Sequence, residues 1–217
     1  MNYATAEDLV AFEARIASLF NTGALPFLIH LSGGNEAQLV EIFREVKDED
    51  WVFSGHRSHS HYLLKGGNAD HLEALIEDGR SMFVFDRERN FYTSSVLGGT
   101  AGIAAGVAWR LKEEGSAAKV WCFLGDGAAD EAHFWEAVWF VEGHGLPCVF
   151  VVEDNNRSVD TDRKTRRGHK DAMNRVLDSL KCVHRYDYVP TYPHGGRGPG
   201  PQVTFLPEVV AKFTNPA

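Results

Sequence analysis

The chain has 217 residues, 44% of them hydrophobic and 24% charged, which is enough for one large domain with a full core. Its net charge of −8 disfavours a nonspecific nucleic-acid binder, which would need a basic face. No apolar run is long enough to cross a bilayer, and the polar, acidic start MNYATAEDLV lacks the order of a signal peptide. We therefore expect a cytoplasmic protein.

Two amphipathic helices are predicted first, over residues 6–20 and 35–46, from apolar positions at helical spacing. Residues 48–67 follow, where a stretch with aromatic residues leads into a histidine-rich loop. A short helix is predicted over 70–78.

The next segment is less regular. SMFVF, at 81–85, is typical of a strand, and DRERNFYTSSVLGG, at 86–99, of a loop. Residues 99–115 are rich in alanine and glycine, which predicts a helix that another element packs against closely.

The centre of the chain has the clearest pattern. A strand at 119–126, a helix at 129–145 and a continuous apolar strand at 147–154 predict a βαβ unit in a buried parallel sheet. A further helix at 170–181 and strand at 182–189 extend it. We predict an α/β fold, with a central, mostly parallel sheet and helices on both faces, as a single domain over residues 1–217.

Polar side chains follow both central strands. Asp126 ends the first, and Asn155 and Asn156 end the second. Because ligands of parallel sheets bind at the carboxyl ends of strands, these residues can converge. A carboxylate and an amide oxygen suit Mg²⁺, and Gly125 and Gly127 allow a diphosphate to approach the backbone. The alternative is a tight turn and an Asx turn with no ligand.

GDGAADEAHFWEAVWFVEGHGLPCVFVVEDNN resembles the thiamine diphosphate motif, which opens with GDG and closes with an asparagine about thirty residues later. The nearest resemblance is to the alpha subunit of the decarboxylating component of 2-oxo-acid dehydrogenase complexes. It implies a thiamine diphosphate-binding fold whose Mg²⁺ takes side-chain oxygens of Asp126 and Asn155 and the main-chain carbonyl of Arg157. Asp154 replaces a family asparagine. The transketolase pattern also aligns with EDNNRSVD and again selects Asn155.

The resemblance extends upstream through DEDWVFSGHRSHSHYLLKGG. It places Arg57 on the arginine that grips the cofactor diphosphate, with His56 in place of the usual tyrosine. His59 and His61 fall on the family's active-site histidines, which implies catalytic roles. The alternative is a solvated loop or an adventitious metal site.

RSMFVFDRERNFYTSSVLGGTAGIAAGVA also resembles the family. Ser95 and Leu97 take positions whose backbone meets the aminopyrimidine, and Phe83 replaces a histidine. The cofactor-binding positions implied are His56, Arg57, Ser95, Leu97, Gly125, Asp126, Gly127, Ala128 and Asn155. DRKTRRGHK, at 162–170, is expected to be a surface loop that could touch phosphate, substrate or a partner.

Three functions remain open. The first is the diphosphate- and Mg²⁺-binding subunit of an enzyme that decarboxylates a 2-oxo acid and passes on the acyl or aldehyde unit. The second is transketolase-like transfer of a two-carbon ketol unit by a split enzyme. The third is a non-catalytic regulatory or scaffold subunit, which would have no need of a diphosphate–metal site.

The resemblance also implies a partner. In the resembled families a second domain binds the aminopyrimidine and supplies the glutamate that activates the cofactor. The length of this chain leaves room for one domain, and none of its acidic residues is recognisable as that glutamate. We expect a pyrimidine-binding, beta-type subunit, an α₂β₂ heterotetramer, and a small 2-oxo acid or ketose substrate.

Overall fold

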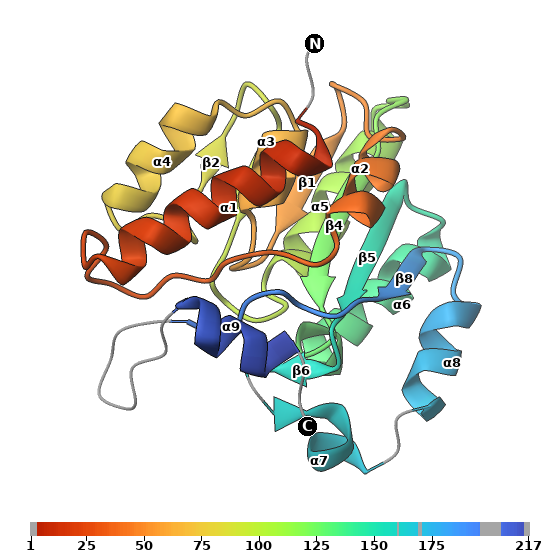
Figure 1. Cartoon of the computed structure of the whole chain (residues 1–217). Helices are drawn as coiled ribbons and strands as arrows, with labels where there is room; N and C mark the ends of the chain where they lie inside the picture. Colours follow the sequence, from red (N-terminus) through yellow and green to blue (C-terminus); the bar gives the residue numbers. More distant parts are fainter. Residues whose placement is uncertain (1–3, 160, 169–170, 196–204, 215–217) are drawn as a thin grey trace. The chain divides into compact units, whose positions relative to one another are not determined.

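A computed structural model describes residues 4–159, 161–168, 171–195 and 205–214 (Figure 1). The chain divides into two compact units. One, called here the helical unit, comprises residues 1–46, 56–84 and 189–217, and the other, the sheet unit, comprises residues 47–55 and 85–188. The expectation of a single diphosphate-binding domain stays a prediction.

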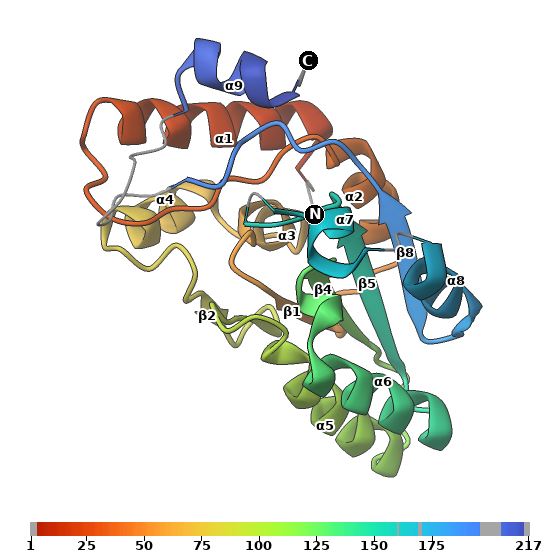
Figure 2. The same cartoon turned by 90° about the horizontal axis from the view of Figure 1, so that it is seen from below.

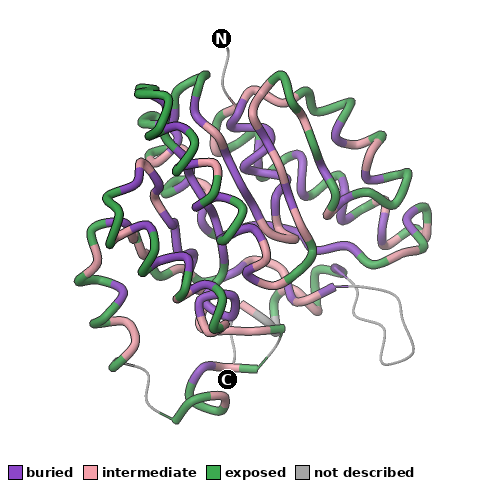
Figure 3. The backbone as a smooth tube through the Cα atoms, turned by 180° about the vertical axis from the view of Figure 1, so that it is seen from behind, coloured by how far each residue is buried: buried purple, intermediate pink, exposed green. Residues whose placement is uncertain are grey.

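The sheet unit has a sheet of six strands within its described residues, in the order β2-β3-β1-β4-β5-β8. The strands are β1 (Trp51–Ser54), β2 (Phe85–Asp86), β3 (Phe91–Thr93), β4 (Val120–Gly125), β5 (Cys148–Asp154) and β8 (Val183–Asp187). Neighbouring strands are parallel except for β2 with β3. The central pair, β4 and β5, is buried along almost its whole length (Figure 3). An α/β fold with a mostly parallel sheet is therefore confirmed.

Helices cover one face of this sheet. They include α5 (Thr100–Glu113), α6 (Ala132–His144) and α8 (Asp171–Ser179). α5 and α6 lie side by side (Figure 2), and the small side chains of α5, including Ala104 and Ala108, allow close packing in the core that also contains Phe134. α6 ends at Gly145, whose φ of 56° suits the left-handed cap.

Short elements follow the two central strands. A 3₁₀ turn, η1 (Ala128–Asp130), comes between β4 and α6. A two-stranded hairpin of β6 (Arg157–Ser158) and β7 (Thr161–Asp162) follows β5 and leads into α7 (Arg163–Arg167).

The helical unit comprises α1 (Ala6–Asn21), α2 (Glu36–Phe43), α3 (His59–Leu64), α4 (Ala69–Glu77) and α9 (Pro207–Thr214). α1 begins with a capping box between Thr5 and Asp8. Its apolar stripe is buried, and Phe20 packs against Phe205 with ring centroids 5.0 Å apart. None of the helices in the described part of the chain is long and apolar enough to span a membrane.

Three local expectations were wrong. The histidine-rich segment contains helix α3, preceded by strand β1. Most of residues 81–85 is not a strand, because β2 begins only at Phe85. β3 lies in the expected loop, where Phe91 pairs with Val52 of β1. These elements are too short to show a periodic pattern, and pairing with a buried strand fixes them instead.

Candidate functional site

Asp126 and Asn155 follow neighbouring parallel strands. β4 and β5 pair up to Gly125 and Glu153, so the chain leaves both strands at the same edge of the sheet. The neighbouring carboxylate of Asp154 also acts electrostatically on Asp126. The expected convergence of the two strand ends is therefore present in the sheet unit.

The Asp126 side chain is buried, with 3% of its surface exposed. Its Oδ2 lies 2.7 Å from Nη2 of Arg166 and 3.3 Å from Nη2 of Arg163. Its Oδ1 has no hydrogen-bond partner among the described residues. Burial raises the pKa of Asp126 to about 6, Asp154 adds to the rise, and the two arginines oppose it. One carboxylate oxygen of Asp126 is thus buried without a hydrogen-bond partner among the described residues, while the other is held by two arginines.

Asn155 lies in a turn that its own side chain stabilises. Its Oδ1 accepts a hydrogen bond from the Arg157 N–H at 2.9 Å, and its Nδ2 donates to Tyr188 Oη at 3.3 Å. Asn156 follows in a left-handed conformation with φ of 60°. The turn is an Asx turn, as the alternative interpretation expected, but the carbonyl-type oxygen of Asn155 has a second lone pair that can accept a metal ion.

The glycines beside Asp126 differ in their surroundings. A Cβ at Gly125 would meet open space, whereas a Cβ at Gly127 would lie 2.7 Å from Ser158 Oγ. The helix expected over residues 129–145 begins only at Ala132, because η1 comes first. The positive N-terminal end of α6 therefore lies at Ala132 and not directly beside Gly127.

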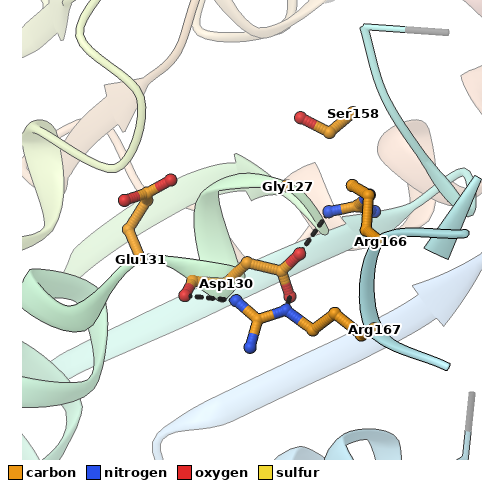
Figure 4. A pocket seen from close by; sticks show the side chains of 6 residues that line it. All are labelled: Gly127, Asp130, Glu131, Ser158, Arg166 and Arg167. Carbon is orange, nitrogen blue, oxygen red and sulfur yellow. Dashed lines mark hydrogen bonds and ion pairs between the residues drawn. The ribbon is translucent and has the colours of Figure 1, made fainter. Parts of the chain in front are cut away.

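A cavity of about 480 Å³ adjoins this turn (Figure 4). Its lining combines the cofactor motif, the β6 hairpin and α7: Gly127, Asp130, Glu131, Ser158, Arg166 and Arg167. Figure 4 shows Arg166 and Arg167 both directed at Asp130.

The arginines of α7 were expected on a surface loop, which is wrong for Arg163 and Arg166. Arg163 is 2% exposed and forms ion pairs with both Asp126 and Asp154. Asp154 also pairs with Arg185 at 2.9 Å. These ion pairs lower the pKa of Asp154, despite the opposing effect of burial. His169 and Lys170, the last two residues of the expected loop, lie outside the described residues.

Ser95 and Leu97 lie in the loop before α5. The Leu97 carbonyl accepts a hydrogen bond from His133 Nε2 at 2.9 Å. Gly98 follows with φ of 68°. The sheet unit thus contains these two positions together with Asp126 and Asn155.

The other expected residues belong to the helical unit. Arg57 is half-buried and donates from Nη1 to the Leu31 carbonyl at 3.0 Å. The His56 ring lies edge-on to His30, with centroids 4.7 Å apart. Burial, reinforced by Arg57 and His194, lowers the pKa of His56 to about 4. His56 is therefore a neutral hydrogen-bonding group at neutral pH.

His59 and His61 are buried on α3. His59 Nδ1 lies 3.1 Å from Glu13 Oε1, and its Nε2 lies 2.8 Å from Ser81 Oγ. The His61 ring stacks on Phe43 at 6.2 Å. Their catalytic roles stay predictions. Glu13 was missed by sequence reasoning because it falls in an ordinary amphipathic helix with other acidic residues.

The donor atoms fit a hard divalent cation rather than a transition metal. The described residues contain no group of three or more histidine, cysteine, aspartate or glutamate side chains that could hold a metal. They do contain the buried Asp126 Oδ1, which has no hydrogen-bond partner among them, the Asn155 amide oxygen after the next strand and, two residues later in the chain, the main-chain carbonyl of Arg157. Mg²⁺ uses such oxygens and completes its shell with water or phosphate.

Comparison with known proteins shows the family of this chain. The family model described as "Dehydrogenase E1 component" matches residues 4–177. The chain belongs to the dehydrogenase E1 component family. The suspected relationship is thereby confirmed.

Two relatives show which subunit of the E1 component this chain is similar to. The alpha subunit of acetoin:2,6-dichlorophenolindophenol oxidoreductase of Bacillus subtilis (strain 168) is 32% identical over 158 residues, covering 68% of this chain and 47% of the relative. The pyruvate dehydrogenase E1 component subunit alpha of Rickettsia bellii is 29% identical over 160 residues, covering 69% and 49%. This E1-family chain therefore spans about half the length of the curated relatives it matches.

Proposed function

We propose that this chain is the diphosphate- and Mg²⁺-binding, alpha-type subunit of a thiamine diphosphate-dependent enzyme that decarboxylates a 2-oxo acid. The observation that carries the proposal is the buried Asp126, whose Oδ1 has no hydrogen-bond partner among the described residues. Asp126 follows the carboxyl end of β4, and Asn155 follows the carboxyl end of the neighbouring β5. Membership of the E1 family supports the same function.

In this proposal each residue has a distinct task. Asp126, Asn155 and the Arg157 carbonyl hold Mg²⁺, and Gly125 leaves room for diphosphate beside the turn. The guanidinium group of Arg57 binds diphosphate oxygens. When bound, thiamine diphosphate supplies a carbon nucleophile and an electron sink for the decarboxylation.

The histidines of the helical unit act on substrate or orient groups that do. His59 is fixed through Nδ1 by Glu13, which holds one tautomer and leaves Nε2 to Ser81. Neutral His56 provides a hydrogen bond without adding a charge beside Arg57.

A beta-type partner completes the site in this proposal. The α5–α6 surface exposes large hydrophobic side chains, among them Trp139 at 56% exposure, and the Trp109 ring stacks on Phe140 at 5.3 Å. Exposed aromatic groups of this kind are enriched at protein interfaces. We assign this surface to subunit contact in an α₂β₂ assembly located in the cytoplasm.

Calorimetry tests the proposal in the assembled enzyme. Asp126→Ala and Asn155→Ala should abolish Mg²⁺-dependent thiamine diphosphate binding, because each removes one side-chain oxygen from the metal. Asp70→Ala, which changes an exposed aspartate of α4, should keep the parental affinity. Unchanged affinity in both site variants would contradict the assignment.

A further inference from the structure

Two arginines of α7 form ion pairs with Asp126, the carboxylate proposed as a metal ligand. Arg166 Nη2 lies 2.7 Å and Arg163 Nη2 3.3 Å from the same oxygen, Asp126 Oδ2. Both guanidinium groups are largely buried, so water screens their charges only weakly. A divalent cation approaching Asp126 therefore meets positive charge already in contact with its ligand.

The two arginines differ in how firmly they are held. Arg163 is buried, also pairs with Asp154, and donates from Nη1 to Asn174 Oδ1 at 2.7 Å. Arg166 lines the cavity beside Gly127 and is 15% exposed. Arg163 thus neutralises Asp154 from a fixed position, while Arg166 has space to move.

Asp130 gives Arg166 a second carboxylate. The Arg166 Nη1 pairs with Asp130 Oδ2, and the Arg166 Nε has no hydrogen-bond partner among the described residues. Arg166 can leave Asp126 and remain paired with Asp130 at the wall of the cavity (Figure 4). Release from Asp126 therefore does not leave a buried guanidinium without a counter-charge.

We propose that Arg166 is an electrostatic latch: it competes with the divalent cation for Asp126, and the cation binds only when Arg166 withdraws to Asp130. This inference rests on the proposed function, since it takes Asp126 as a metal ligand. It makes α7 a control element of metal uptake, with Arg163 as its fixed anchor.

The test measures Mn²⁺ binding by the full chain, with free Mn²⁺ followed by electron paramagnetic resonance. Arg166→Gln should bind Mn²⁺ at least about tenfold more tightly than the parental chain, because a competing charge has gone. Arg166→Lys keeps the positive charge and should stay within about threefold of the parental affinity. Lys164→Gln is the matched control, since Lys164 is an exposed cation of the same helix, and should stay within about twofold.

The outcomes separate the latch from the metal site itself. The tighter binding of Arg166→Gln should disappear when Asp126→Asn is added. Equal Mn²⁺ affinity in the parental chain and Arg166→Gln would overturn the latch and leave the metal site standing. An equal gain in Arg166→Lys would also overturn it, because the gain would then come from loosened structure. Absence of Mn²⁺ binding in every variant would overturn both the latch and the proposed metal site.

Discussion

His30 is a buried titratable residue that sequence reasoning did not single out. Its ring packs against His56 and His194, with centroids 4.7 Å and 4.2 Å away, and its Nδ1 has no partner within the described residues. Burial lowers the pKa of His30 to about 2, and His56, His194 and Arg57 add to the effect. His30 therefore stays neutral in the folded chain at every pH at which the protein is expected to work.

This neutrality predicts acid sensitivity. Between the unfolded pKa of 6.5 and the folded pKa of about 2, the unfolded chain binds a proton that the folded chain excludes, so stability is lost as pH falls. At pH 5 the loss from His30 is about 2 kcal/mol. Urea unfolding at pH 7.5 and 5.0 should show His30→Gln losing less stability than the parental chain by that amount. His71→Gln, on an exposed face of α4, should lose as much stability as the parental chain. Equal losses of stability in the parental chain, His30→Gln and His71→Gln would contradict the prediction.

The residues of the candidate metal site were predictable, but the cations around them were not. Asp126 and Asn155 follow apolar strands, and strand ends converge in any parallel sheet. Arg163 and Arg166 lie in a basic segment that is indistinguishable from a solvated loop by composition. Asp154 was the available signal, because an aspartate in place of a family asparagine adds a buried negative charge that needs a partner.

At the scale of elements, the turn into α5 depends on one glycine. Gly98 has φ of 68°, and a Cβ there would lie 2.7 Å from His133 Nε2, the atom that bonds to the Leu97 carbonyl. A side chain at this position is strained by its backbone and displaces the imidazole that fixes the loop. The loop carrying Ser95 and Leu97 is thereby coupled to α6.

Gly98→Ala should destabilise the chain by about 1–3 kcal/mol in urea unfolding. Gly102→Ala provides the control, since Gly102 lies in α5 with open space around a Cβ, and alanine there should be neutral or stabilise by up to about 1 kcal/mol. Equal effects of the two substitutions would show that the turn does not require glycine.

Long helices and strands were easier to predict from the sequence than short ones. The β4–α6–β5 unit was evident because two continuous apolar strands flank a long helix closed by Gly145. β1 has four residues and β3 has three, so neither shows a pattern by itself. Their place is set by pairing with each other and, for β1, with β4, which is tertiary information.

At the scale of the whole molecule, the question is whether the chain contains its own activating glutamate. The buried glutamates of the described residues are Glu13 and Glu153. Glu13 is bonded to His59 and to the Ser32 N–H, and Glu153 accepts from Tyr186 Oη at 2.8 Å. Both are already engaged inside their own units, and in the proposed function the activating glutamate belongs to the beta-type partner.

We therefore predict that the purified chain by itself shows no substantial turnover. It should be assayed with thiamine diphosphate, Mg²⁺ and a panel of 2-oxo acids and ketose phosphates, alone and with its co-purifying beta-type partner. Activity should arise only in the mixture, because we expect the diphosphate and the pyrimidine of the cofactor to bind to different chains. Trp139→Glu places a charge on the exposed α5–α6 surface and should weaken assembly, whereas Val10→Glu, at an exposed position of α1, should not. Turnover by a preparation that mass spectrometry shows to contain a single polypeptide would refute the shared active site.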